Sequence, residues 1–221
     1  MKVKTQSKKV NKAWLNDHVN DTYVKLAKHD GYRARAAYKL KEIDEKFGLI
    51  KPGQLVVDLG STPGAWSQYI RRKMSPKTAI SGGAVGELVG KIIALDLLEM
   101  APIEGVTFLH GDFREEALLQ QLKAEMQGQL ADVVVSDMAP NLSGIEATDS
   151  ARVEHLIELA IDFCQNHMKP QGALVAKVFH NSAYNQLVNL FKTHFKTVKV
   201  VKPAASRPGS AETFLVGMGL Q

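Results

Sequence analysis

The chain has 221 residues, of which 45% are hydrophobic, enough for one domain with a sizeable core, and this argues against global disorder. Its net charge of +5 is uneven, because the first 51 residues hold thirteen Lys or Arg and six Asp or Glu, which leaves −2 for the rest. A single cysteine excludes an internal disulfide and no apolar run approaches the length of a membrane span, so we expect a cytoplasmic protein without membrane contact.

The chain begins with a basic arm, expected over residues 1–30, ahead of a single domain over residues 31–221. The positive charge of this arm has two interpretations. The arm either binds a polyanion such as RNA or is a solvated tail that aids solubility. A helix is expected at 31–48, where apolar residues recur at helical spacing. Arg35 and Lys39 lie four residues apart and therefore share another face of that helix.

After residue 51 the pattern predicts strands that alternate with helices. Short runs rich in Val, Ile and Leu predict seven strands, at 55–60, 91–97, 106–110, 132–137, 173–179, 197–201 and 213–218. Helical patterns lie between them, at 64–74, 114–127, 151–168 and 182–193. This alternation is typical of an α/β fold whose mostly parallel sheet is covered by helices on both faces. The last two strands should pair antiparallel, because the segment 202–211 is too short for a helical crossover.

One segment interrupts the alternation. Residues 75–90 are rich in Gly and Ser and carry little charge, so we expect a long flexible loop between the first helix of the sheet and the second strand. Cys164 falls within the helix expected at 151–168 and should pack there as a small hydrophobic side chain.

Acidic side chains lie at or just after the carboxyl ends of the first four predicted strands, at the positions where open α/β sheets bind ligands. These residues are Asp58, Asp96, Asp112 and Asp137. The turn after the first strand contains Gly60 and Gly64 but lacks the G-x-G-x-x-G spacing of a dinucleotide site. A rim of carboxylates suits a positively charged ligand such as S-adenosylmethionine better than NAD, which leaves a nicotinamide oxidoreductase as a distant alternative.

Lys177 interrupts the apolar run Leu174–Phe179, and a lysine rarely occupies a buried strand unless it is paired. It is either a side chain that reaches solvent from the strand end or a reactive amine beside the ligand. Asp137 should end the neighbouring strand, Glu212 should open the last strand, and Lys39 would come from the first helix, folded over the same edge. The seven histidines form no cluster at ligand spacing, so no metal site is expected.

Several stretches of the chain together resemble the FtsJ/RrmJ-type ribose 2′-O-methyltransferases of large-subunit ribosomal RNA. They are, in order, RARAAYKL at 33–40, VVDLG at 56–60, PGAWSQY at 63–69, DLL at 96–98, GDFR at 111–114, SDMAPN at 136–141 and KVF at 177–179. The match runs from about Trp14 to the C-terminus with similar spacing. The family usually has a second glycine where this chain has Ala65, a position that we expect to be helical already, and the 75–90 loop is longer than in the family.

This resemblance implies a Rossmann-like class I methyltransferase fold, with a seven-stranded, mostly parallel sheet and an antiparallel last strand. It implies methyl transfer from S-adenosylmethionine to the ribose 2′-hydroxyl of a uridine in 23S ribosomal RNA, within the 50S subunit or its precursor, by a monomer. It assigns catalysis to Lys39, Asp137, Lys177 and Glu212. It assigns cofactor binding to Gly64, Trp66, Asp96, Asp112 and Asp137.

In the mechanism that we favour from the sequence, Lys177 orients the hydroxyl and accepts its proton late, while Asp137 positions Lys177. RNA phosphates should meet the arm, Arg33, Arg35 and Arg207. Two alternatives stay open: a ribose methyltransferase of transfer RNA or organellar ribosomal RNA, and a non-catalytic RNA-binding assembly factor that keeps the fold.

Overall fold

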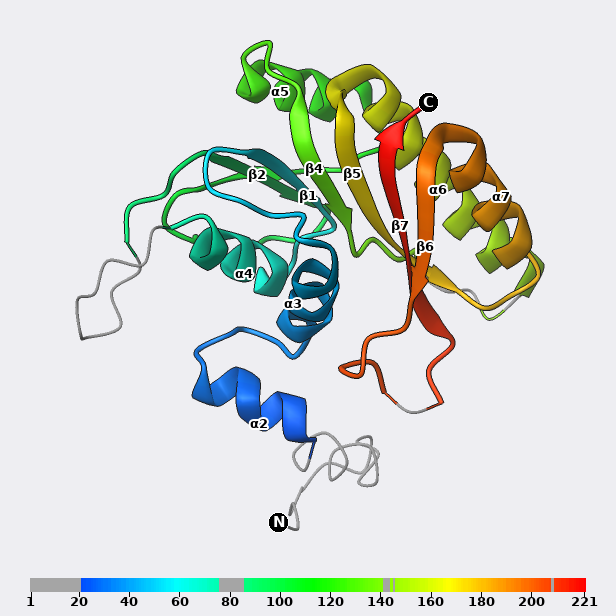
Figure 1. Ribbon diagram of the computed structural model, residues 1–221, viewed down its shortest axis with the longest axis horizontal. Coiled ribbons are helices and arrows are strands. Elements are labelled where there is room, and N and C mark those ends of the chain that lie inside the picture. The colour runs from blue at the N-terminus through cyan, green and yellow to red at the C-terminus, as the bar shows by residue number, and fades with distance from the viewer. Residues whose placement is uncertain (1–20, 76–85, 141–143, 145, 208) are drawn as a thin grey trace.

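The computed structural model describes residues 21–75, 86–140, 144, 146–207 and 209–221 (Figure 1). Its centre is one seven-stranded sheet with the strand order β3-β2-β1-β4-β5-β7-β6. The strands are β1 Leu55–Leu59, β2 Lys91–Asp96, β3 Val106–His110, β4 Ala131–Ser136, β5 Met168–Phe179, β6 Phe195–Val201 and β7 Glu212–Leu220. Strands β1 to β5 pair in parallel, whereas β7 runs antiparallel to both β5 and β6, which confirms the predicted pairing.

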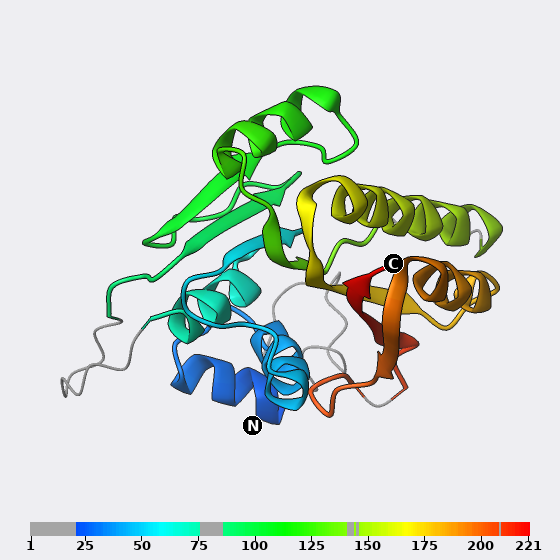
Figure 2. The ribbon, with the colours of Figure 1, turned by 45° about the horizontal axis from the view of Figure 1, so that its top comes forward.

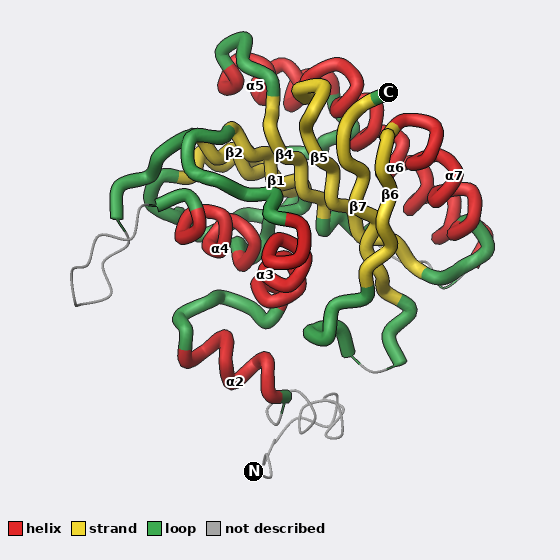
Figure 3. Tube along the Cα trace, in the orientation of Figure 1, coloured by secondary structure: helices red, strands yellow, loops and turns green. Residues whose placement is uncertain are grey.

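Helices cover both faces of the sheet, as predicted (Figure 3). The helices are α2 Thr22–His29, α3 Ala36–Phe47, α4 Ala65–Lys73, α5 Glu116–Met126, α6 Glu146–His167 and α7 Tyr184–His194. Successive side chains of a strand point to opposite faces, so Leu55, Val57 and Leu59 of β1 pack in the core with α5, α6 and α7. Val56 packs on the other face, with α3 and α4. Burial on both faces explains why the strands read as continuous apolar runs.

The sequence pattern does not predict helix α2. Asp21 caps its start, because the carboxylate accepts hydrogen bonds from the backbone N–H groups of Tyr23 and Val24 at 2.9 and 3.2 Å. Its only buried residue is Ala27, which packs against Tyr38 and Ala205. One buried residue leaves no apolar periodicity to detect. The division of the chain at residue 30 stays a prediction.

Two elements begin five residues earlier than predicted. Strand β5 begins at Met168, because the chain pairs with β4 through an irregular register before the regular ladder starts at Ala173. The segment 169–172 contains Pro170 and Gly172, residue types that are uncommon within strands. Helix α6 begins at Glu146. Within it Cys164 is fully buried, as expected, and burial raises the pKa of its thiol.

Of the expected 75–90 loop, residues 76–85 lie outside the described part of the chain. Among the helices that the structure describes, none is long and apolar enough to span a bilayer. The carboxyl ends of β1 to β5 meet at one edge of the sheet, above helices α2 and α3 in Figure 2, and the predicted site residues gather there.

Candidate active site

A cavity of about 650 Å³ opens at the carboxyl edge of the parallel strands. Small-molecule sites in proteins commonly have volumes of this size. Three of the acidic residues predicted at strand ends line it, Asp96, Asp112 and Asp137, and Lys177 lines it as well. One face of α6 also contributes, through Arg152, which was not predicted.

Asp96 connects two walls of the cavity. Its Oδ2 accepts a hydrogen bond from the backbone N–H of Thr62 at 2.8 Å, and its Oδ1 accepts one from that of Leu98 at 2.8 Å. The carboxylate thereby holds the turn between β1 and α4 against the end of β2. Because a carboxylate has about four acceptor positions, both oxygens can still accept a bond from a ligand.

Asp112 is fixed by a residue that was not predicted. Arg114 donates from Nε to both carboxylate oxygens, at 2.9 and 3.0 Å, and from Nη2 at 2.5 Å. These hydrogen bonds hold the pKa of Asp112 below its usual value. The carboxylate is therefore ionised and oriented before any ligand arrives. Its partner is two residues away in the GDFR stretch, a spacing that could have suggested the pair.

Gly64 and Trp66 are not among the residues that line the cavity. Gly64 has φ +103°, a backbone conformation that favours glycine, and a Cβ there would lie 2.8 Å from Nη1 of the Arg33 side chain. Ala65 begins helix α4, as expected for this departure from the family pattern. The Trp66 indole is buried and donates to the Ala36 carbonyl at 2.8 Å, so its side chain supports α3. Cofactor contacts from Gly64 and Trp66 stay predictions.

The guanidinium of Arg33 donates hydrogen bonds to three backbone carbonyls. Its Nη1 donates to Pro63 and Ala101 at 3.0 and 2.6 Å, and its Nη2 donates to Pro102 at 2.8 Å. Arg33 thus joins the β1–α4 turn to the segment that follows β2. The predicted contact of Arg33 with RNA stays a prediction, and these three bonds already use most of the side chain's donors.

Lys177 and Asp137 form the inner pair of the site. Lys177 is 8% exposed, so it does not reach solvent from the strand end. Its Nζ donates to the backbone carbonyl of Asp137 at 2.6 Å and lies 2.9 Å from Oδ1 of the same residue. The register of β4 with β5 brings them together, since Ser136 is opposite Ala176. Oδ1 of Asp137 is buried and has no hydrogen-bond partner among the described residues. Its contact with the Lys177 Nζ is therefore an ion pair whose geometry does not form a hydrogen bond.

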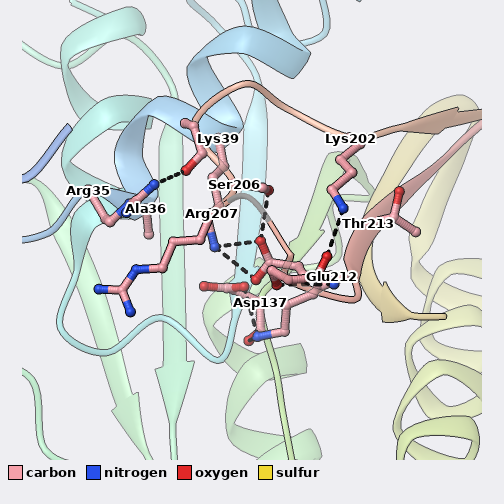
Figure 4. Close-up of polar contacts among 12 residues, drawn as sticks. Arg35, Ala36, Lys39, Asp137, Lys202, Ser206, Arg207, Glu212 and Thr213 are labelled. Atoms are coloured by element: carbon pink, nitrogen blue, oxygen red, sulfur yellow. Dashed lines mark hydrogen bonds and ion pairs between the residues drawn. The ribbon is translucent and has the colours of Figure 1, made fainter. Parts of the chain in front are cut away.

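Lys39 and Glu212 form the outer pair (Figure 4). The Lys39 Nζ lies 2.6 and 2.8 Å from the two carboxylate oxygens of Glu212, and Ser206 donates to Glu212 Oε1 at 3.0 Å. Neither residue of this pair lines the cavity. The Lys39 Nζ also lies 5.9 Å from the ring centre of Phe214, the residue that pairs with Lys177 across β5 and β7. The two pairs are therefore neighbours, one inside the cavity and one outside it.

Helix α3 holds the 202–211 segment that carries Ser206. Glu42, one turn after Lys39, accepts hydrogen bonds from the backbone N–H groups of Ala204 and Ala205 at 2.6 and 3.0 Å. Arg35 donates to the Ala205 carbonyl at 2.5 Å and forms an ion pair with Asp21. Glu42 was not predicted, because its partners lie 162 and 163 residues away along the chain, and Ser206, six residues before Glu212, was not predicted either.

Arg35 and Arg207, both predicted to contact RNA, lie on either side of one carboxylate. Arg207 Nε is 3.9 Å from Asp21 Oδ2, the oxygen with which Arg35 is paired. Asp21 therefore draws both arginines to the outer side of the site, near the Lys39–Glu212 pair (Figure 4). Their contacts with RNA stay predictions.

Asp58 lies beneath the cavity and is fully buried. Burial, reinforced by the nearby charges of Asp137 and Asp96, raises its pKa to about 7, against a hydrogen bond from Ser67 that acts in the other direction. Its second oxygen has no hydrogen-bond partner among the described residues. Asp58 therefore ionises near neutral pH, close to the charges of Asp137 and Asp96.

This raised pKa predicts a pH-dependent stability. Between about pH 4 and pH 7 the folded protein binds the Asp58 proton more tightly than the unfolded chain, so the free energy of unfolding should fall as pH rises. A rise in the Asp58 pKa from about 4 to about 7 corresponds to a fall of at most roughly 4 kcal/mol. Asp58→Asn keeps an acceptor for Ser67 and should remove this fall, as measured by denaturant unfolding at pH 5 and pH 8. Equal pH dependence in the two proteins would contradict the assignment.

Comparison with known proteins gives consistent matches. The family model for FtsJ-like methyltransferases matches residues 32–220. Among curated proteins, the chain is 72% identical to the ribosomal RNA large subunit methyltransferase E of Albidiferax ferrireducens, over all of this chain and 99% of the relative. It is 71% identical to the protein of the same name from Variovorax paradoxus, over all of this chain and 98% of that one. Among solved structures, a ribosomal RNA methyltransferase from Plasmodium falciparum matches with a TM-score of 0.71 and 28% identity, covering 86% of this chain and 98% of that chain.

Proposed function

Because this chain belongs to the FtsJ-like methyltransferase family, we propose that it transfers a methyl group from S-adenosylmethionine to the ribose 2′-hydroxyl of a uridine in 23S ribosomal RNA. The names of its close relatives support large-subunit ribosomal RNA as the substrate. As part of the same proposal, the protein acts in the cytoplasm as a monomer, on the 50S subunit or its precursor.

The cavity fits S-adenosylmethionine in size, and its three carboxylates, whose charge Arg114, Arg152 and Lys177 balance, offer acceptors for the hydroxyl and amino groups of the cofactor. The cofactor supplies an electrophilic methyl group on a positively charged sulfur, and its amino group is a second cation. Three carboxylates line the cavity, and Asp137 Oδ1 is a buried acceptor without a hydrogen-bond partner among the described residues. In this proposal Asp96 accepts from the ribose hydroxyls, Asp112 accepts from the adenine amino group, and Asp137 faces the cationic end.

The position of Lys177 is the observation that best supports the proposed methyl transfer. Its Nζ lies at the wall between the cavity and the outer Lys39–Glu212 pair, where a ribose hydroxyl must approach. Asp137 holds this amine through both its carbonyl and its carboxylate. In its uncharged form, Lys177 would orient the 2′-hydroxyl and accept its proton as the carbon–oxygen bond forms and the bond between the methyl carbon and the sulfonium sulfur breaks.

The outer pair would position the ribose. Glu212 is held by Lys39 and Ser206, so its orientation is set before RNA binds. Lys39 places a positive charge where the ribose–phosphate backbone would pass, and Arg35 and Arg207 would contact the flanking phosphates.

Mass mapping of methylated nucleotides tests the proposed function. The protein and S-adenosylmethionine are incubated with 50S particles from cells that lack the modification, with free 23S RNA and with transfer RNA. We expect a 2′-O-methyluridine in 23S RNA. Methylation of transfer RNA alone would contradict the substrate, and cofactor binding without methylation of any RNA would identify a non-catalytic assembly factor instead.

The three carbonyl contacts of Arg33 predict an effect on cofactor binding. Arg33→Ala should loosen the turn at Pro63 and the segment at Ala101, and should raise the Kd for S-adenosylmethionine about tenfold, since each lost hydrogen bond is worth about 1 kcal/mol. Calorimetry measures this Kd, and the salt dependence of RNA binding should keep its slope.

Arg72→Ala is the matched control. Arg72 also donates to backbone carbonyls, those of Asp30 and Gly31, but it does not contact the cofactor loops. Its replacement should change the cofactor Kd less than about twofold. If Arg33 instead contacts a phosphate, its replacement would lower the salt slope by about 0.7 to 0.9 and leave the cofactor Kd unchanged.

A further inference from the structure

The charges of this chain fall into three blocks. Residues 1–51 carry a net +7 and residues 163–221 carry +6, whereas residues 52–162 carry −8. The last block contains no Asp or Glu from residue 163 to residue 211, a stretch with seven Lys or Arg. A protein that binds a polyanion at one face needs its cations on that face, so the positions of the two basic blocks in the fold decide where RNA can lie.

The fold places the described part of the first block, residues 21–51, next to the last block. Helix α3 of the first block contacts the 202–211 segment of the last block through Glu42, whose carboxylate holds the backbone of Ala204 and Ala205. The Lys39–Glu212 pair joins the same two blocks. The acidic block forms β1 to β4 with α4 and α5, on the other side of the site, and most of α6, which packs beside α7 (Figure 1).

Strand β6 forms one outer edge of the sheet and belongs to the basic block. Lys192 at the end of α7 and Lys196 and Lys199 on β6 are exposed. We call these three lysines the basic edge. Within the described residues none of them forms an ion pair, and no carboxylate lies near them in sequence. Three exposed and uncompensated cations on one edge form a surface that favours an anionic partner.

The basic edge leads to the active site. Strand β6 continues at its carboxyl end into the 202–211 segment, which brings Ser206 to Glu212. Seven residues of strand extend for about 23 Å, which is long enough to lie beside several consecutive phosphates.

We propose that the basic edge binds the phosphate backbone of the RNA substrate, so that the RNA leaves the catalytic site along β6 and away from the acidic half of the sheet. This inference rests on the proposed function. Lysines on an edge strand can also serve to prevent edge-to-edge pairing with another sheet. Replacing the lysines distinguishes the two roles, because the loss of a phosphate contact weakens RNA binding whereas the loss of edge protection causes self-association.

The test compares a triple variant, Lys192→Gln, Lys196→Gln and Lys199→Gln, with the wild type, using a 23S RNA transcript over a range of salt concentrations. The triple variant should raise the Kd for RNA at least tenfold and lower the slope of log Kd against log salt by about 2 to 3, since each phosphate contact contributes about 0.7 to 0.9. The KM for RNA should rise, while kcat at saturating RNA and the Kd for S-adenosylmethionine should stay unchanged.

A double variant, Lys46→Gln with Lys51→Gln, is the control for charge. Both lysines are exposed and lie near the amino end of β1, away from the site, so their replacement should leave the slope unchanged. An unchanged slope in the triple variant overturns the inference, and self-association of that variant would then show that the lysines protect the edge. Wild-type protein that binds the transcript but methylates no ribosomal RNA would contradict the proposed function and not the basic edge.

Discussion

Lys177→Ala is expected to reduce methyl transfer by about 10²- to 10⁴-fold, the range typical for the loss of a positioned general base, while S-adenosylmethionine still binds. Lys177 is the only lysine that lines the cavity within the described residues, and its Nζ is held by Asp137 at 2.6 and 2.9 Å. Among the described residues that line the cavity, no other side chain has an amine that could accept the proton of the ribose 2′-hydroxyl. Single-turnover methylation measures the first effect and calorimetry with the cofactor measures the second.

Two further variants make this result interpretable. Lys177→Met fills the buried space with an apolar chain of similar length, so it separates loss of the amine from loss of packing. Lys169→Ala removes another lysine of β5, one that is paired with Asp132 at 2.7 Å at the opposite end of the strand. It should leave turnover near the wild-type value. Near-wild-type turnover of Lys177→Met would show that Lys177 is not the proton acceptor.

Asp137→Ala should weaken both functions of the site. The side chain lines the cavity and lies against the Lys177 amine, so its loss removes a ligand for a cation and releases the amine from its position. We expect the Kd for S-adenosylmethionine to rise about tenfold to a hundredfold, equivalent to about 1.4 to 2.8 kcal/mol, and kcat to fall at least about a hundredfold.

Asp132→Asn provides the matched control for Asp137. Asp132 belongs to the same strand, β4, but lies at its amino end, where its Oδ2 accepts from the backbone N–H of Leu55 at 2.9 Å. Its replacement should change neither the cofactor Kd nor kcat. A variant of Asp137 that loses turnover with an unchanged cofactor Kd would limit its role to holding Lys177.

These variants separate the inner pair from the outer pair. Lys39 and Glu212 lie outside the cavity, so their replacement should affect RNA positioning without raising the cofactor Kd. The resemblance to the family treats the four residues as equivalent. Their placement divides them into one pair that lines the cavity, Asp137 and Lys177, and one pair that does not, Lys39 and Glu212.

The sequence alone determined the architecture and the inner half of the site. Strand and helix signals depend on near neighbours, so the apolar runs of β1 to β5 and the helices between them could be read along the chain. Acidic residues at strand ends predicted a ligand site because parallel strands end at one edge of the sheet. Lys177 stood out because a cation within an apolar strand requires a partner, and the adjacent strand end offered Asp137.

The tertiary structure alone decided the contacts between distant segments. Lys39 and Glu212 are 173 residues apart, and Glu42 reaches Ala204 over 162 residues. No local pattern reports such pairs, because they depend on how helix α3 folds over the sheet edge. Arg33 shows the same dependence, since its charge suggested a phosphate while the fold presents three carbonyls to it. The two basic blocks likewise became neighbours only when packing brought helix α3 against the 202–211 segment.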